Sequence, residues 1–242
     1  MGLAPVDIVA TWEQGAGRRA HERAVILLDA VMPGSSVDDV LDLAIGARDA
    51  ALLDVHRALV GGRVEGTSGC ESCGETLEVV FEVDDVTVDA ESMPGEQTIQ
   101  CAGYEVTFHL PNGRDLALAE AASDVAGARA VLLARCLTSA RFDGVPVSIG
   151  DLPEHVIDAV DDAMAAADPQ GDLEIATSCP ACAAPQRLLF DPITFVWSEL
   201  EERARRVLRD VHELASAYGW REDEVMALPE ARRSLYLELV TG

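Results

Sequence analysis

The stretches CESCGETLEVVFE (residues 70–82) and CPACAAPQRLLFD (residues 179–191) are two copies of one motif. Each copy begins with a Cys-x-x-Cys pair and carries a phenylalanine followed by an acid at the same distance from the second cysteine. Each is also preceded, at the same spacing, by an apolar residue and a glutamate. Apolar and polar residues alternate after the first pair, as expected for a strand leaving a turn. The repeat therefore predicts one structural unit that is used twice.

The four cysteines of the repeat are Cys70, Cys73, Cys179 and Cys182, and we predict that they bind one structural zinc ion. A Cys-x-x-Cys turn offers two thiolates, so two turns brought together complete a tetrahedral four-sulfur site. The cost of closing the long loop between the turns grows only logarithmically with its length. Structural zinc contributes roughly 10–16 kcal/mol in small peptides, which exceeds that cost. The alternative, a redox dithiol, would need a βαβ context that neither pair has.

The composition and the cysteine spacing indicate a folded protein whose cysteines are reduced. Hydrophobic residues make up 49% of the 242 residues, which excludes a largely disordered chain. Charges interrupt the apolar runs well before the roughly 18 residues that a membrane span requires. The first residues do not resemble a secretory leader. We therefore expect a cytoplasmic protein, in which paired cysteines are metal ligands rather than disulfides.

The charge balance is strongly acidic, with 43 acidic residues against 18 basic ones and a net charge of -25. Such a charge repels phosphate backbones and anionic membranes. We therefore expect protein partners and no nucleic-acid or membrane partner. The alternative explanation of the acidity is ordinary solvated helix faces together with a biased genome, since lysine is absent from the chain.

The chain is expected to fold as a mainly helical α+β protein with three segments. Residues 1–62 form an N-terminal helical segment, residues 63–190 a zinc-ribbon core with inserted strands and helices, and residues 191–242 a C-terminal helical segment. The fold is expected to contain a split four-cysteine zinc ribbon and a long C-terminal amphipathic helix.

Before the first motif, apolar spacing predicts three helices. The first covers residues 19–31 and is broken at Pro33-Gly34. Ser36 begins the second with a capping box, and Gly46 is expected to end it. The third covers residues 48–60 and stops at two glycines.

Between the motifs, the pattern predicts a loop over residues 91–97 and a strand over residues 104–110. A helix is expected over residues 115–138, with Val125 and Cys136 on its apolar stripe. Another helix is expected to start near Asp151 and to close at Asp168-Pro169.

After the second motif, Asp191 and Pro192 start a long helix whose apolar positions repeat in steps of four and three. The stripe consists of Ile193, Trp197, Leu200, Ala204, Val207, Val211, Leu214 and Tyr218. Glutamates and arginines on the outer face are spaced for ion pairs one turn apart. Gly219 ends this helix, and two shorter helices are expected over residues 222–227 and 229–240.

No residue set for catalysis is found. Cys101 and Cys136 do not form a Cys-x-x-Cys pair and are expected to pack in the core. The five histidines are scattered without metal-ligand spacing, no glycine-rich loop has the ending of a phosphate-binding motif, and no serine lies in a nucleophile elbow. We therefore expect a protein that is not an enzyme.

Most of the chain resembles a known family. The matching stretches include TWEQGAG, HERAVILLDA, the segment from GARDAALLDVHRALV through the first cysteine motif, FHLPNGRDLA, and the segment from ADPQGDLEIATS to the last helix. These stretches resemble uncharacterised zinc-motif proteins encoded in phage-tail-like contractile injection system clusters, which are distantly similar to baseplate hub assembly proteins of T-even-type phages. The resemblance implies a structural or assembly role, with baseplate, hub or other particle proteins as partners.

Two positions depart from the family pattern. Ala183 stands where glycine often follows the second cysteine, which predicts a slightly different turn. His109 stands where arginine usually precedes Leu-Pro, so the contact that a charged arginine would make there is not predicted for this chain.

Two other classes of function remain open at the level of sequence. One is a zinc-ribbon adaptor that recruits a cytosolic enzyme or transcription machinery. The other is the dithiol redox enzyme.

Overall fold

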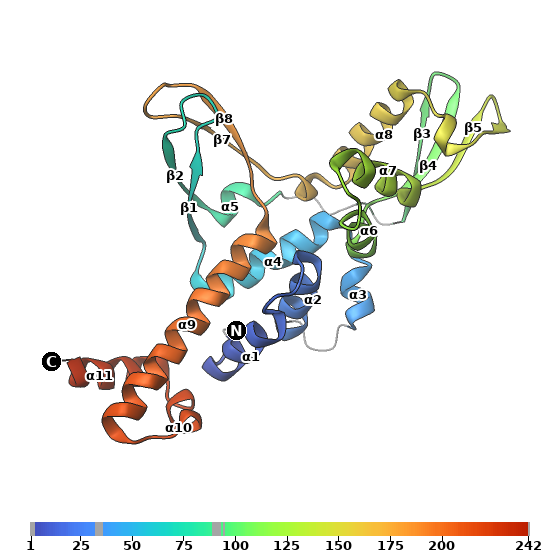
Figure 1. The fold of residues 1–242 in the computed structure, drawn as a ribbon. Coiled ribbons are helices and arrows are strands. Elements are labelled where there is room, and N and C mark those ends of the chain that lie inside the picture. Colours follow the sequence, from blue (N-terminus) through green and yellow to red (C-terminus); the bar gives the residue numbers. More distant parts are fainter. Residues whose placement is uncertain (1–2, 32–35, 89–92, 94, 242) are drawn as a thin grey trace.

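The structure, a computed structural model, describes residues 3–31, 36–88, 93 and 95–241 (Figure 1). It is 57% helical with 20% strand, which confirms the expected mainly helical α+β fold. The helices are α1 (Pro5–Gly15), α2 (Ala20–Val31), α3 (Val37–Leu41), α4 (Ile45–Val60), α5 (Val83–Val86), α6 (Gly113–Ala119), α7 (Val125–Cys136), α8 (Glu154–Ala167), α9 (Pro192–Tyr218), α10 (Glu222–Met226) and α11 (Glu230–Thr241).

The strands form separate antiparallel sheets. Two are hairpins, β1 (Arg63–Gly69) with β2 (Thr76–Glu82) and β7 (Glu174–Ser178) with β8 (Pro185–Leu189). The third is a four-stranded sheet in the order β3 (Glu96–Cys101), β4 (Tyr104–His109), β5 (Leu137–Phe142) and β6 (Val145–Pro146). Each hairpin carries one Cys-x-x-Cys pair in its turn, which confirms the predicted duplication of the unit.

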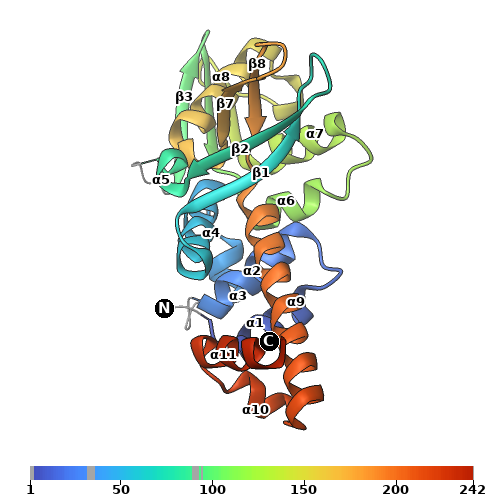
Figure 2. The same cartoon turned by 90° about the vertical axis from the view of Figure 1, so that its left-hand side faces the viewer.

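The largest core joins the two ends of the chain. The 27-residue helix α9 packs against α1, α2 and α4 (Figure 2). Its side of this core contains the buried Ile193, Trp197, Leu200, Ala204 and Val207, and the later stripe position Leu214 is also buried, so the predicted stripe is confirmed over most of the helix. Each such side chain contributes about 1.5–3 kcal/mol when it is fully buried. The end of the stripe lies beyond this core, where Tyr218 is 42% exposed.

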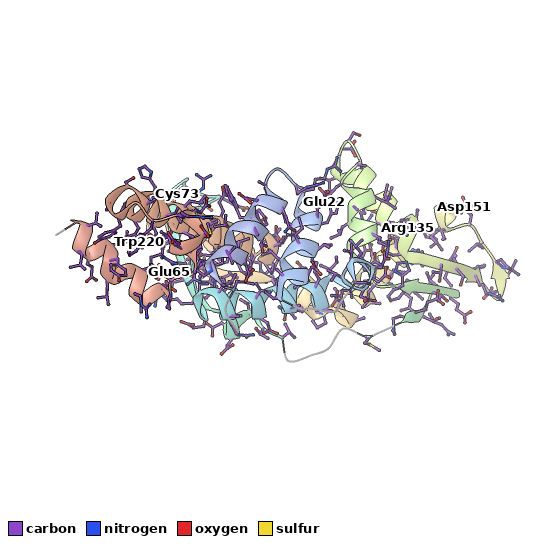
Figure 3. All side chains as sticks on the ribbon, turned by 90° about the horizontal axis from the view of Figure 1, so that it is seen from below. Glu22, Glu65, Cys73, Arg135, Asp151 and Trp220 are labelled. Carbon is purple, nitrogen blue, oxygen red and sulfur yellow. The ribbon has the colours of Figure 1, made fainter. Side chains whose placement is uncertain are left out.

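A second core lies under the four-stranded sheet. The helix α8 packs its buried Val156 and Val160 against Val106 and Phe108 of β4 and against Cys136. The helix predicted to close at Asp168 is therefore confirmed, and so is the core position of Cys136. Asp151, beside this sheet, and Trp220, in the C-terminal segment, lie at opposite ends of an elongated molecule (Figure 3).

The prediction that Gly46 ends a helix is wrong. The helix α3 ends at Leu41, and Gly46 is the second residue of α4. Its N–H donates to the Asp168 carboxylate at 2.8 Å, and a Cβ added at this position would lie 2.1 Å from the other oxygen of that carboxylate. Glycine is required because a distant carboxylate caps α4 at close range, not because the chain turns.

The helix predicted over residues 115–138 is two helices, α6 and α7, because Asp124 caps the second one. The Asp124 side chain accepts the Gly127 N–H at 2.7 Å. Val125, expected on the apolar stripe, is 86% exposed, and β5 begins at Leu137. The apolar periodicity of the sequence therefore showed neither the interruption at Asp124 nor the end of the helix at Cys136.

Two other predictions concern the loops. The loop predicted over residues 91–97 overlaps β3, which begins at Glu96 and pairs with β4. Its residues 91, 92 and 94, like the break at Pro33-Gly34, lie outside the described residues. The capping box at Ser36 is confirmed, since its hydroxyl accepts the Asp39 N–H.

Among the helices of the described ranges, none combines the length and the apolar character needed to span a bilayer.

Candidate metal centre

The turns of the two hairpins bring the predicted ligands together. The sulfur atoms of Cys70, Cys73, Cys179 and Cys182 all lie within 4.8 Å of one another. The Cys70–Cys182 and Cys73–Cys179 sulfur separations are 3.8 and 3.7 Å. Four sulfurs at about 2.3 Å from a central zinc ion would be separated by about 3.8 Å, so these distances fit a tetrahedral shell. They are far longer than a disulfide bond of about 2.05 Å.

Both cysteine turns use the same backbone hydrogen bonds. In the first, Gly74 N–H donates to Cys70 C=O at 2.8 Å, and in the second Ala183 N–H donates to Cys179 C=O at 2.9 Å. Both residues have a left-handed backbone, with φ of 75° at Gly74 and 58° at Ala183. The expectation of a different turn at Ala183 is therefore wrong. The turn is kept, and the alanine Cβ bears the steric cost of this conformation.

The two hairpins pack with an approximate two-fold relation. The first cysteine of each pair lies beside the second cysteine of the other pair. At the base of the hairpins, the repeated phenylalanines Phe81 and Phe190 make an edge-to-face contact at 5.1 Å. The repeated apolar residues Val64 and Leu173 are buried in the same cluster. Because Phe195 of α9 and Leu53 of α4 join this cluster, the helices hold the hairpins in place.

One side chain breaks the symmetry and links the hairpins. Leu77 and Gln186 occupy equivalent positions, four residues after the second cysteine, and both are buried. The Gln186 carbonyl oxygen accepts the Glu71 N–H of the other turn at 3.1 Å. Sequence reasoning missed this contact. The signal for it was a polar residue at a position that is apolar in the other copy of the repeat.

The electrostatics of the cluster are those of crowded thiols. Burial disfavours the Cys70 thiolate, yet the amide groups of Cys73 and Ser72 donate to its sulfur and lower the pKa of Cys70 to about 7. The Glu75 amide lowers the pKa of Cys73, but the neighbouring Cys182 thiol and burial outweigh it and raise that pKa to about 12. Within the first turn, the Cys70 thiol therefore ionises more readily and the Cys73 thiol less readily than a free cysteine. A central cation would favour the ionised form of both.

A second group of possible ligands, His109, Asp115 and Cys136, lies beside the four-stranded sheet. Both His109 ring nitrogens lie 2.9 Å from backbone carbonyl oxygens, those of Leu110 and Arg135. The buried Asp115 carboxylate accepts from the Arg135 guanidinium at 3.1 Å. The Asp115 carboxylate is thus paired within the protein, and Arg135 supplies a cation beside the position where His109 departs from the family pattern.

The fold and the centre together define a mainly helical α+β protein in which two sequence-distant hairpins meet at a four-cysteine cluster compatible with a metal site. Residues 25–197 match the family described as T4 bacteriophage base plate protein, and the chain belongs to this family. Comparisons with curated proteins and with solved structures gave no match.

The strained turn gives a direct test of the repeat. We expect Ala183→Gly to raise the free energy of unfolding by about 0.5–1 kcal/mol, because glycine adopts a left-handed backbone without steric cost while the unfolded chain gains some entropy. The matched variant is Gly74→Ala, which should lower it by a similar amount, since only its positive φ opposes a Cβ there. Urea unfolding of the metal-loaded protein measures both. Shifts of the same sign in the two variants would contradict the equivalence of the turns.

Proposed function

We propose that this protein is a zinc-stabilised structural or assembly component of the baseplate of a contractile, phage-tail-like particle. In this proposal it acts by binding other baseplate proteins and performs no catalysis. The observation that carries the proposal is its membership of the base plate family over residues 25–197. The acidic surface supports protein rather than nucleic-acid partners.

The cysteine cluster supports a structural role for the proposed zinc ion. Cys70, Cys73, Cys179 and Cys182 together would fill all four positions of a tetrahedral shell, so no position would remain for a water or a substrate. The metal would act as a cross-link between two cysteine pairs that 105 residues of chain separate. Chain segments inserted between the hairpins would then be held in a defined place relative to α4 and α9.

We further propose that the C-terminal helical segment contacts the partner. The family match ends at Trp197, so most of α9 and all of α10 and α11 lie beyond the shared part. The side chains of Leu235 and Leu239, one turn apart on α11, are 60% and 73% exposed. Exposed leucines grouped on one helix face are typical of a surface that a partner covers.

An aromatic cluster adds to this surface. Tyr218 stacks on Trp220 with ring centroids 4.8 Å apart, and Tyr236 of α11 packs edge-on against Trp220 at the same distance. These rings belong to the end of α9, the residues that follow it and α11. In Figure 1, α10 and α11 lie at the bottom of the molecule and the turns of the two hairpins at the top. Clustered, partly exposed aromatics are common anchors in protein interfaces.

Truncation after Gly219 tests the docking proposal. We expect sheath and tube proteins to be made normally while few complete particles are seen by electron microscopy, as in a strain that lacks the gene. The metal content of the truncated protein should stay near that of the wild type, because all four cysteines lie upstream. Normal particle yield in the deletion strain would reject the assembly role. A defect in the deletion but not in the truncation would reject only the docking site.

A pair of point variants separates docking from folding. The double variant Leu235→Ser and Leu239→Ser should reduce particle yield, because it removes the exposed apolar surface without opening the core. The matched control is Val125→Ser with Val145→Ser, which changes two exposed apolar residues far from α11, one at the start of α7 and one in β6. Equal yields from the two doubles would contradict a specific role for α11.

A further inference from the structure

A groove of about 590 Å³ lies between the beginning of α1, the middle of α9 and α11. Helices α1 and α11 both contact α9, and α11 lies across the lower part of α9 (Figure 2). Leu3, Ile8, Val207 and Leu228 contribute apolar surface to the groove. It is thus a separate site from the aromatic cluster and from the cysteine centre.

Three arginines line this groove, Arg203 and Arg206 of α9 and Arg233 of α11. Neither Arg203 nor Arg206 has an ion-pair partner in the part of the chain that the structure describes. On the same helix, the exposed Arg205 and Arg209 pair with glutamates at 2.7 and 3.3 Å. Acidic residues outnumber basic ones by 43 to 18, so a shortage of acids does not explain unpaired arginines in a groove.

Arg233 gives a second, independent sign of a missing anion. The residue is only 5% exposed, and its Nε donates to Asp210 at 2.7 Å. Its Nη1 is buried and has no acceptor among the described residues. A buried guanidinium nitrogen without an acceptor is unfavourable, and a carboxylate bound in the groove would supply one.

We propose that this groove binds a carboxylate-bearing segment of a partner protein, with aspartate or glutamate side chains on the three arginines and a neighbouring apolar side chain on the leucine and isoleucine surface. This inference rests on the proposed function, in which the protein binds other baseplate proteins. Paired arginine–carboxylate contacts beside apolar surface are an established mode of recognition between proteins.

The surroundings favour a short carboxylate segment over other anions. Asp210, Glu230 and Glu238 also line the groove, and they repel a compact doubly charged phosphate, whereas a peptide can place each singly charged carboxylate against an arginine and away from these acids. A nucleic acid would extend over the acidic surface outside the groove. At physiological salt, charges farther than about 8 Å are largely screened. A group held within the groove is therefore governed by the groove's own three arginines and three acids, of which Asp210 is already paired with Arg233.

The experiment compares two double variants of the metal-loaded full chain. Arg203→Gln with Arg206→Gln removes two charges from the groove. Arg205→Gln with Arg209→Gln removes two charges from the same helix outside it. The probe is a blocked synthetic peptide that contains leucine next to two glutamates, and binding is measured by calorimetry. A second peptide has glutamine in place of glutamate.

We expect the groove variant to weaken binding of the glutamate peptide at least tenfold and the control variant to change it less than twofold. The glutamine peptide should bind at least tenfold more weakly to the wild type. The melting temperature of the groove variant should be equal to or above that of the wild type, because unpaired like charges are removed. A lower melting temperature with unchanged peptide binding would assign these arginines to the fold instead.

Three results would overturn the proposal. They are no measurable binding of the glutamate peptide, equal loss in the two double variants, or tighter binding of inorganic phosphate or a single-stranded oligonucleotide than of the peptide. Particle yield separates this inference from the proposed function. Normal yield from the groove variant, in a system where gene deletion is defective, rejects the groove and keeps the assembly role. Normal yield from the deletion itself rejects the assembly role, while the peptide measurement still decides the groove.

Discussion

Cys179→Ser is expected to abolish stoichiometric zinc binding and to unfold the two hairpins together. The wild-type protein should contain one zinc ion per chain, held by Cys70, Cys73, Cys179 and Cys182, because their sulfur separations match a tetrahedral shell. Structural zinc contributes roughly 10–16 kcal/mol in small peptides, as much as the whole stability of a typical domain. Both turns supply ligands to the same ion, so removal of one ligand should affect both.

Metal analysis and thermal unfolding measure this effect. The matched control is Cys101→Ser, because Cys101 is a half-buried thiol outside the cluster and should leave the zinc content unchanged. A chelator should reproduce the Cys179→Ser effect in the wild type. Zinc content near zero in the wild type, or unchanged in Cys179→Ser, would reject the four-sulfur site. Independent melting of the two hairpins would reject the cross-link.

Gly46→Ala should lower the free energy of unfolding by about 2–4 kcal/mol, although alanine favours helices more than glycine does. The new Cβ would lie 2.1 Å from Asp168 Oδ1, so the carboxylate must move and its hydrogen bond to the Gly46 N–H would be lost. The loss combines overpacking with the removal of a helix cap. Urea unfolding of the purified protein provides the measurement.

Gly127→Ala is the matched control for this prediction. Gly127 also lies in the first turn of a helix and also donates its N–H to an aspartate, Asp124. A Cβ there would lie 3.3 Å from that carboxylate, a distance that a small shift accommodates. We expect this variant to be neutral or slightly stabilising. A similar loss in both variants would show that glycine matters at these sites for the helix start, and not for the approach of Asp168.

Much of the local structure follows from the sequence alone. The two cysteine turns, the strands after them, the capping box at Ser36 and the long helix that ends at Gly219 all match its patterns. These features depend on residues close together in the chain, because turns, caps and helix periodicity are set by neighbouring dihedral angles and side chains. The repeat also identified the four cysteines that the fold brings together.

The tertiary structure determined the features that depend on contacts between distant residues. Gly46 is required by Asp168, which lies 122 positions away, and Gln186 links the two turns across a separation of 115. The pairing of Cys70 with Cys182 follows from how the hairpins pack, since the spacing of the cysteines allowed either arrangement. Local periodicity carries no information about such partners, because it records only which face of an element is apolar and not what lies against that face.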